Sequence, residues 1–158
     1  MSKQKGFSLI ELLIVVTVIM VISAIAVPNF LRSRLAANEA SAVRGLRTIG
    51  TAETAYVASY GPNYSADLAS LGGTSCTIPL STAACLIDDG LAHATSPDTS
   101  RSGFYYTYAI SSSVGYTLNS DPAYWNKTGS KHFYADASGV IRSTSANTPA
   151  VVTDPAVQ

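Results

Sequence analysis

The stretch that decides the fold runs from Lys3 to Phe30, "KQKGFSLIELLIVVTVIMVISAIAVPNF". Two lysines and a glycine precede a run from Phe7 to Val27 that is almost wholly apolar, in which only Glu11 is charged. The run is long enough for a helix that spans a bilayer, which needs about 20 apolar residues. A carboxylate in hydrocarbon costs about 2.5–3.5 kcal/mol, so Glu11 is a functional candidate.

Composition narrows the classes of function. The chain has 158 residues, a formal net charge of zero and only 13% charged residues, so it holds at most one modest domain beyond the apolar run. A neutral chain gives no electrostatic argument for a nucleic-acid partner. We expect no metal site, because no His/Cys/Asp cluster has ligand spacing, and no enzyme, because no nucleophile has an assignable base.

Three interpretations of the N-terminus compete. Lys3 and Lys5 with a small-x-small site ending at Ala26 would suit a secretory signal peptide, whose removal would release a secreted binding module. A plain signal anchor, which would give a membrane-anchored module, explains the length of the run but not Glu11. In the third interpretation a peptidase cuts after Gly6, where a glycine allows close backbone approach, and Phe7 becomes the new terminus.

Cutting after Gly6 would give Glu11 a partner. The free amine of Phe7 and the carboxylate of Glu11 cannot easily meet within one helix start, but they could pair between neighbouring copies packed in parallel with a small axial stagger. A paired buried charge is tolerated and specifies register, whereas an unpaired one is strongly unfavourable.

The residues from Lys5 to Phe30 closely resemble the N-terminal segment of type IV prepilins and of the related pseudopilins of type II secretion. The resemblance implies leader cleavage after Gly6, N-methylation of Phe7, and subunit assembly through Phe7 and Glu11. It further implies a structural subunit of a type IV pilus, of the major type IVa kind, serving adhesion, motility or DNA uptake. The alternative within the family is a pseudopilin that builds a periplasmic pseudopilus.

The resemblance also implies a life cycle. The single-pass precursor would wait in the bacterial inner membrane with a periplasmic head, and would then join an extracellular pilus as a homopolymer with itself. The implied partners are a prepilin peptidase/methylase, an inner-membrane assembly machine with an ATPase, and an outer-membrane secretin. No cofactor is implied.

Beyond the leader (1–6) we expect an α+β protein. A long N-terminal helix, with a transmembrane half (7–28) and an amphipathic half (29–60), would pack on a four-stranded antiparallel sheet (103–145), the pilin fold. Pro28 would kink the helix or break it. Apolar residues at helical spacing predict the amphipathic half, with charged residues, Glu53 included, mainly on its other faces. Gly45 and Gly50 would permit close packing within it.

The rest of the chain is less regular. Gly61-Pro62 predicts the end of the helix, and residues 61–102 read as a connecting loop with short helices near 66–71 and 82–88. The strands are expected at 103–112, 115–120, 131–136 and 139–145, and His132 is expected as a surface or sheet residue. An even cysteine count in an exported chain favours a disulfide between Cys76 and Cys85. Residues 146–158 read as a flexible tail.

Overall fold

The computed structural model describes residues 7–73, 76, 78–112 and 115–157. The chain divides into two units, with the boundary between Arg34 and Leu35. We call the second unit, residues 35–158, the head. The elements follow the predicted order of one long helix, short helices and four strands, which confirms the α+β class.

Helix α1 spans Leu9–Tyr60 and contains Pro28. The helix is therefore continuous through the proline, which removes the alternative of a break between anchor and domain; the kink at Pro28 stays a prediction. Proline has no N–H to donate, so one backbone hydrogen bond is missing from the turn before it. The helix ends where predicted, at Gly61, whose φ of +121° suits glycine and no helical residue.

The sheet contains β1 (Phe104–Ser112), β2 (Gly115–Pro122), β3 (His132–Asp136) and β4 (Arg142–Thr144). All neighbours are antiparallel in the order β1-β2-β3-β4, as expected for two consecutive hairpins. The predicted turn at Ser113-Val114 lies outside the described residues. The second turn is closed by Asp136, whose side chain accepts the amide of Ser138 at 2.9 Å.

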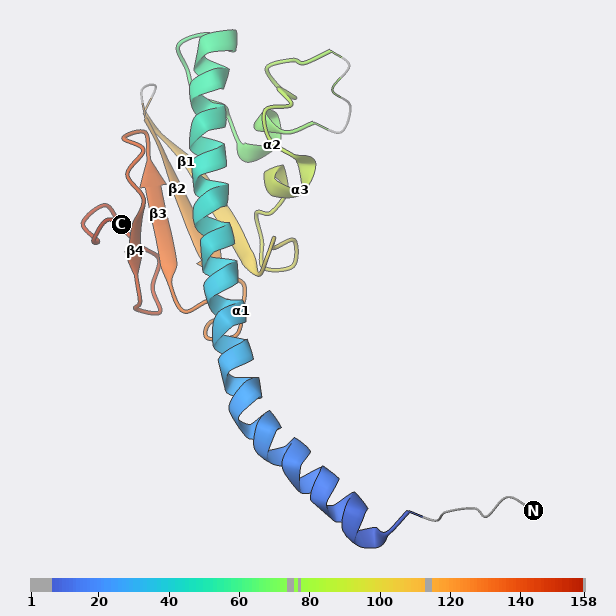
Figure 1. Cartoon of the computed structure of the whole chain (residues 1–158). Helices are drawn as coiled ribbons and strands as arrows, with labels where there is room; N and C mark the ends of the chain where they lie inside the picture. The colour runs from blue at the N-terminus through green and yellow to red at the C-terminus, as the bar shows by residue number, and fades with distance from the viewer. Residues whose placement is uncertain (1–6, 74–75, 77, 113–114, 158) are drawn as a thin grey trace. The chain divides into compact units, whose positions relative to one another are not determined.

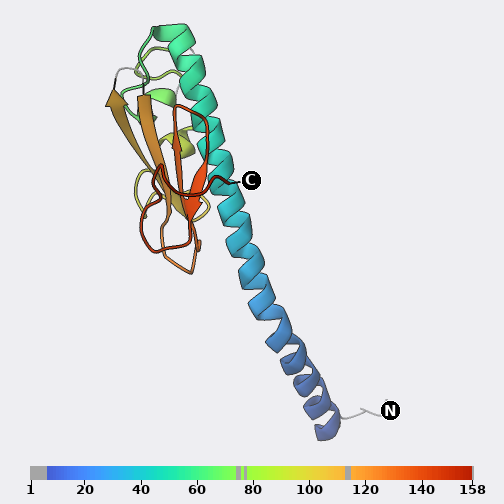
Figure 2. The same ribbon diagram turned by 90° about the vertical axis from the view of Figure 1, so that its left-hand side faces the viewer.

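The head has two layers, with the second half of α1 lying across one face of the sheet (Figures 1 and 2). Apolar side chains of both layers form a single core. The buried members from α1 are Ala42, Leu46, Ile49, Ala52 and Tyr56, and those from the strands are Phe104, Tyr106, Tyr116, Leu118, Phe133 and Ala135. Predicted helical spacing thus selects the buried face of α1 correctly.

Gly45 sets how closely α1 approaches the sheet. A Cβ built on Gly45 would lie 2.1 Å from the hydroxyl oxygen of Tyr106 and 2.7 Å from Cζ, closer than any real contact. A Cβ on Gly50 would lie 3.3 Å from the hydroxyl of Tyr116, which can shift slightly. The predicted packing role is therefore confirmed, and it is strict only at Gly45.

The connecting region holds α2 (Leu68–Leu71) and α3 (Asp89–Ala92). The helix expected at 82–88 begins later because Asp88 is its N-cap and accepts the amide of Leu91 at 3.1 Å. Residues 84–87 instead bond the segment at α2, for example through the amide of Ala84 and the carbonyl of Ser70 at 2.8 Å.

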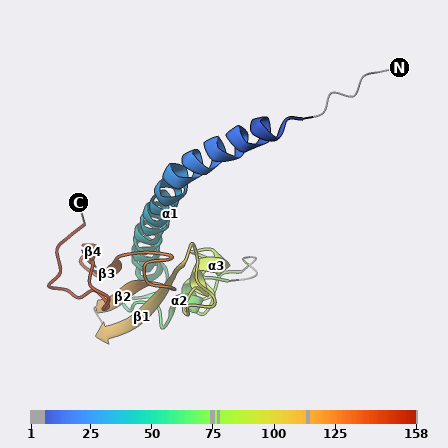
Figure 3. The same ribbon diagram turned by 90° about the horizontal axis from the view of Figure 1, so that it is seen from below.

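The C-terminal segment differs from the expected flexible tail. The amide of Ser143 donates to the carbonyl of Pro155 at 3.0 Å, and that of Val157 donates to Ile141 at 2.8 Å. Ala150 is buried, and its carbonyl accepts the side chain of Asn119. The segment therefore lies beside β4, which it joins by an isolated bridge between Arg142 and Ala156, at the edge opposite β1 (Figure 3).

Gly45→Ala tests the close approach. We expect it to lower the free energy of unfolding of the full chain in detergent by about 1–3 kcal/mol, because overpacking outweighs the helix propensity gained. The measurement is urea unfolding followed by near-ultraviolet circular dichroism. Gly50→Ala is the matched control and should change stability little. Equal effects of the two substitutions would contradict the role given to Gly45.

Alkaline pH tests the burial of tyrosines in the core. Burial raises the pKa of Tyr106 and of Tyr116 to about 12 each, and that of Tyr108 as well. The unfolded chain therefore loses these protons first, near pH ~10, so stability is full below that pH and falls as the pH rises toward about 12. Urea unfolding across this range should show the loss, with a shallower slope for Tyr106→Phe. An unchanged slope in that variant would contradict the assignment.

Candidate assembly site

The first unit presents apolar side chains that nothing in the described chain covers. Every residue from 7 to 34 is exposed, and Phe7, Leu9 and Phe30 are 78%, 82% and 66% exposed. We call residues 7–31 the apolar segment. By length and composition, α1 is the one helix among the described residues that could cross a membrane. Such a surface requires lipid or other protein around it.

Glu11 lies in the first turn of α1 and has a partner within its own chain. Its Oε2 accepts the backbone N–H of Ser8 at 2.9 Å. Ser8 precedes the first helical residue, so this bond is the glutamate half of a capping box, in which Glu at the third helical position satisfies the amide of the N-cap. The S-x-x-E spacing could have revealed this contact in the sequence, and our interpretation missed it.

The other polar groups of the apolar segment are modest. The Thr17 hydroxyl donates to the carbonyl of Ile14 at 2.8 Å, so the helix itself satisfies it. Phe7 is described and exposed, whereas Gly6 and the predicted leader lie outside the described residues. The pairing of Phe7 with Glu11 is predicted between copies and stays a prediction.

The disulfide is confirmed. Cys76 and Cys85 are bonded, with their Cα atoms 5.8 Å apart. The amide of Cys85 donates to the carbonyl of Gly72 at 2.9 Å, which fixes one end of the loop beside α2. Ile78 and Leu80 lie within this loop and are 74% and 57% exposed. The disulfide therefore closes a short surface loop in the connecting region.

Glu53 is completely buried, although the amphipathic pattern placed it mainly on a solvent face. Its two carboxylate oxygens accept the amide of Ser65 at 3.0 Å and the hydroxyl of Ser65 at 2.5 Å. The hydroxyl of Tyr108 then donates to the carbonyl of Ser65 at 3.1 Å. This carboxylate ties the loop after α1 to the helix, because a buried charge needs such donors. The sequence interpretation missed this contact because Ser65 lies beyond the end of α1, where helical spacing gives no information.

Glu39 holds a second loop. Its Oε1 accepts both the amide and the hydroxyl of Ser130, at 2.9 and 2.8 Å, and its Oε2 lies 3.9 Å from Nζ of Lys131. The side chain of the preceding residue, Asn38, donates to the carbonyl of Thr128 at 2.9 Å. The loop between β2 and β3 is thereby fixed to α1.

His132 lies on β3 as expected but is buried and not a surface residue. Its Nδ1 lies 2.5 Å from Oδ1 of the buried Asp121, and its ring stacks on Trp125 with centroids 4.9 Å apart. Its Nε2 has no partner among the described residues. The pair joins β2 to β3.

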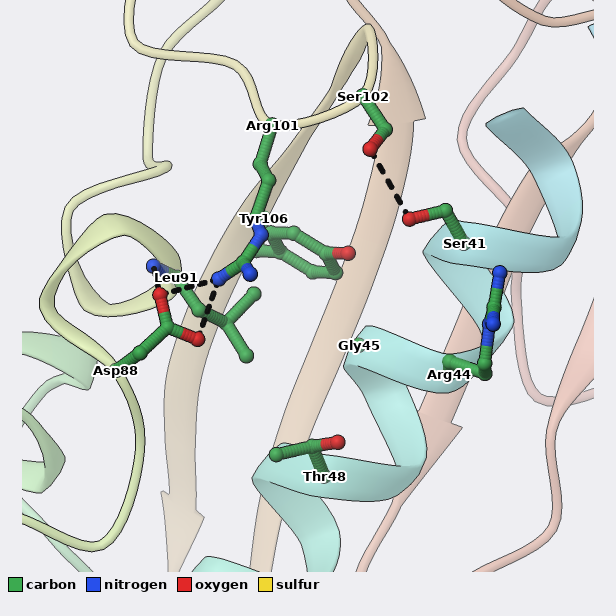
Figure 4. A pocket seen from close by; sticks show the side chains of 9 residues that line it. All are labelled: Ser41, Arg44, Gly45, Thr48, Asp88, Leu91, Arg101, Ser102 and Tyr106. Atoms are coloured by element: carbon green, nitrogen blue, oxygen red, sulfur yellow. Dashed lines mark hydrogen bonds and ion pairs between the residues drawn. The ribbon is translucent and has the colours of Figure 1, made fainter. Parts of the chain in front are cut away.

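A polar pocket of about 340 Å³ lies between α1 and the loop before β1 (Figure 4). Arg101 forms an ion pair with Asp88, which holds the pKa of that carboxyl below its usual range. The hydroxyls of Ser41 and Ser102 are 3.1 Å apart and join the two walls. Asp88 therefore already neutralises the charge of Arg101 in this pocket. No group of acidic, histidine or cysteine residues that could hold a metal occurs in the described part of the chain.

The comparisons with known proteins concern the N-terminal motif and one pilin. Residues 1–27 match the family model described as the prokaryotic N-terminal methylation motif. The chain is 37% identical to the type IV major pilin protein PilA of Myxococcus xanthus (strain DK1622) over 54 residues, which are 34% of this chain and 24% of that relative. The match thus spans about a quarter of the relative's length. No solved structure matched the chain significantly.

Both matches support the assignment of this chain to the type IV pilin family, as its N-terminal sequence predicts. The long N-terminal helix and the four-stranded antiparallel sheet are consistent with the pilin fold. The family is one of structural pilins and not of enzymes. The N-terminal motif and the apolar helix of this chain fit a membrane-anchored precursor that becomes part of a pilus.

Proposed function

We propose that this chain is a structural subunit of a type IV pilus that polymerises through the apolar segment of α1. The observation that carries the proposal is the exposure of every apolar residue in this segment. The segment has one charged residue, Glu11, which lies in the first turn of α1. Neighbouring copies of the same segment would cover this surface in the fibre, as lipid would cover it in the membrane.

The proposal includes a processing step and a set of partners. A prepilin peptidase/methylase would cut between Gly6 and Phe7 and methylate the new amine. The subunit would wait in the inner membrane with its head in the periplasm. An ATPase-driven inner-membrane machine would then add it to a homopolymer that leaves through an outer-membrane secretin and serves adhesion, motility or DNA uptake.

The assembled fibre would supply a partner for the charge at Glu11. The carboxylate uses Oε2 for the amide of Ser8, which leaves Oε1 to accept the Phe7 amine of a neighbouring subunit. Charge-assisted hydrogen bonds of this kind are about twice as strong as neutral ones. Pro28 would allow the helix to adjust by a kink as subunits pack.

Processing is tested by N-terminal mass analysis of chain recovered from membranes and fibres. We expect a mature chain that starts at Phe7 and carries one methyl group. Gly6→Val should retain the leader, because a side chain there blocks close backbone approach. A start at Val27 would instead identify a secreted module, and an intact leader in the parent chain would identify a plain anchor.

The role of Glu11 is tested by Glu11→Gln, which removes the charge but keeps a carbonyl oxygen to accept the amide of Ser8. The variant should insert in the membrane and be cleaved normally. The number of fibres should fall by more than about tenfold, because a buried amine without its counter-charge costs about 3–5 kcal/mol.

Glu11→Asp is the matched control for charge. It keeps the carboxylate but is one methylene short, so we expect an intermediate fibre yield, counted by electron microscopy of cells whose only copy is the variant. A normal yield from Glu11→Gln would show that the charge is not needed for assembly.

A further inference from the structure

Two arginines follow the apolar segment directly. Arg32 and Arg34 are exposed, and neither forms an ion pair among residues 7–73, 76, 78–112 and 115–157. The next acidic residue along the helix, Glu39, is already bound to Ser130. The two guanidinium groups are therefore fully available to a partner outside the chain.

Their distance along the helix places them at a particular depth. From Leu9 to Arg32 the helix rises about 35 Å at 1.5 Å per residue. The hydrocarbon core of a bilayer is about 30 Å thick, and about 40–45 Å with the headgroup regions. If the start of α1 lies at one edge of the core, Arg32 and Arg34 reach the headgroups of the opposite leaflet.

Their direction favours lipid over protein as the partner. Residues two apart on an α-helix differ by about 200° in direction, so Arg32 and Arg34 point to nearly opposite sides. A protein packed on one face of the helix could pair with one of them only. A lipid leaflet surrounds the helix and offers phosphates to both.

The chemistry of arginine agrees with this partner. A guanidinium donates two parallel hydrogen bonds to a phosphate, which an ammonium cannot do. The position also excludes the usual topological reason for such charges. In the proposed orientation the cytoplasmic flank is the one with Lys3 and Lys5, and cations on the other flank do not serve the positive-inside preference.

We infer that Arg32 and Arg34 bind phosphate groups of phospholipid headgroups in the outer leaflet of the inner membrane and so fix the depth of the waiting subunit. The inference rests on the proposed membrane-anchored precursor. Each subunit that enters a fibre would have to exchange these phosphates for other surroundings, so the contact acts before assembly and not in the fibre.

The test uses the full chain in bilayers of phosphatidylcholine and phosphatidylglycerol, with isotope-labelled guanidinium carbons. Solid-state NMR detects guanidinium groups close to lipid phosphorus through carbon-to-phosphorus dipolar dephasing. We expect dephasing in the parent chain and its near-complete loss in the double variant Arg32→Gln, Arg34→Gln. The matched control, Arg44→Gln with Arg47→Gln, removes two exposed arginines of the head and should keep the signal.

The outcomes separate this inference from the proposed function. Flotation with vesicles first establishes that each variant is membrane-bound, and a parent chain that does not float overturns the membrane-anchored precursor itself. A floating parent without dephasing, or equal loss in both double variants, overturns the lipid contact alone. The measurement is made at a low protein-to-lipid ratio, where copies do not meet, and a signal that is absent there in the floating parent overturns the contact.

Discussion

The rest of the molecule depends on one constraint, which is that the apolar segment, helical from Leu9 onward, has side chains that the described part of the chain does not cover. Burial of such side chains stabilises by about 1.5–3 kcal/mol each for the larger ones, so water is not a tolerable environment for this surface. Lipid and a bundle of identical helices are both apolar, and transfer between them changes little in hydrophobic free energy. Polar groups such as Glu11 must therefore decide between the two environments.

The second half of the same helix has the opposite task, because it must bind its own sheet and keep no apolar face exposed. It does so by directing its acidic side chains inward, where Glu39 and Glu53 each bind a loop through serine donors. Glu53 is fully buried, and no cation among the described residues bonds it, so the amide and the hydroxyl of Ser65 offset the desolvation of its carboxyl group. The arginines of α1 remain on the surface, and the exposed face of the helix is consequently basic.

Local patterns predicted the fold well, and long-range contacts limited what could be predicted of the site. The apolar run, the Gly61-Pro62 stop and the two hairpins follow from composition and turn chemistry. The burial of Glu53 and of His132 depends on Ser65 and Asp121, which lie 12 and 11 positions away across a turn of the chain, and no helical or strand period encodes such pairs. The C-terminal segment looked like a tail because its own composition is simple, whereas its hydrogen bonds come from the edge of β4. In contrast, the cap between Ser8 and Glu11 is local and was legible in the sequence.

That cap changes how the carboxylate can be understood. A glutamate in hydrocarbon costs about 2.5–3.5 kcal/mol, and a hydrogen bond to a charged group contributes about 1.5–3 kcal/mol. The amide of Ser8 can thus offset much of the cost while the subunit has no neighbour. Because this bond uses Oε2, the cap does not compete with an amine that approaches Oε1. The carboxylate of Glu11 is thus tolerable in a single subunit and better satisfied beside the amine of a neighbouring one. Such a charge favours assembly without making the waiting subunit unstable in the membrane.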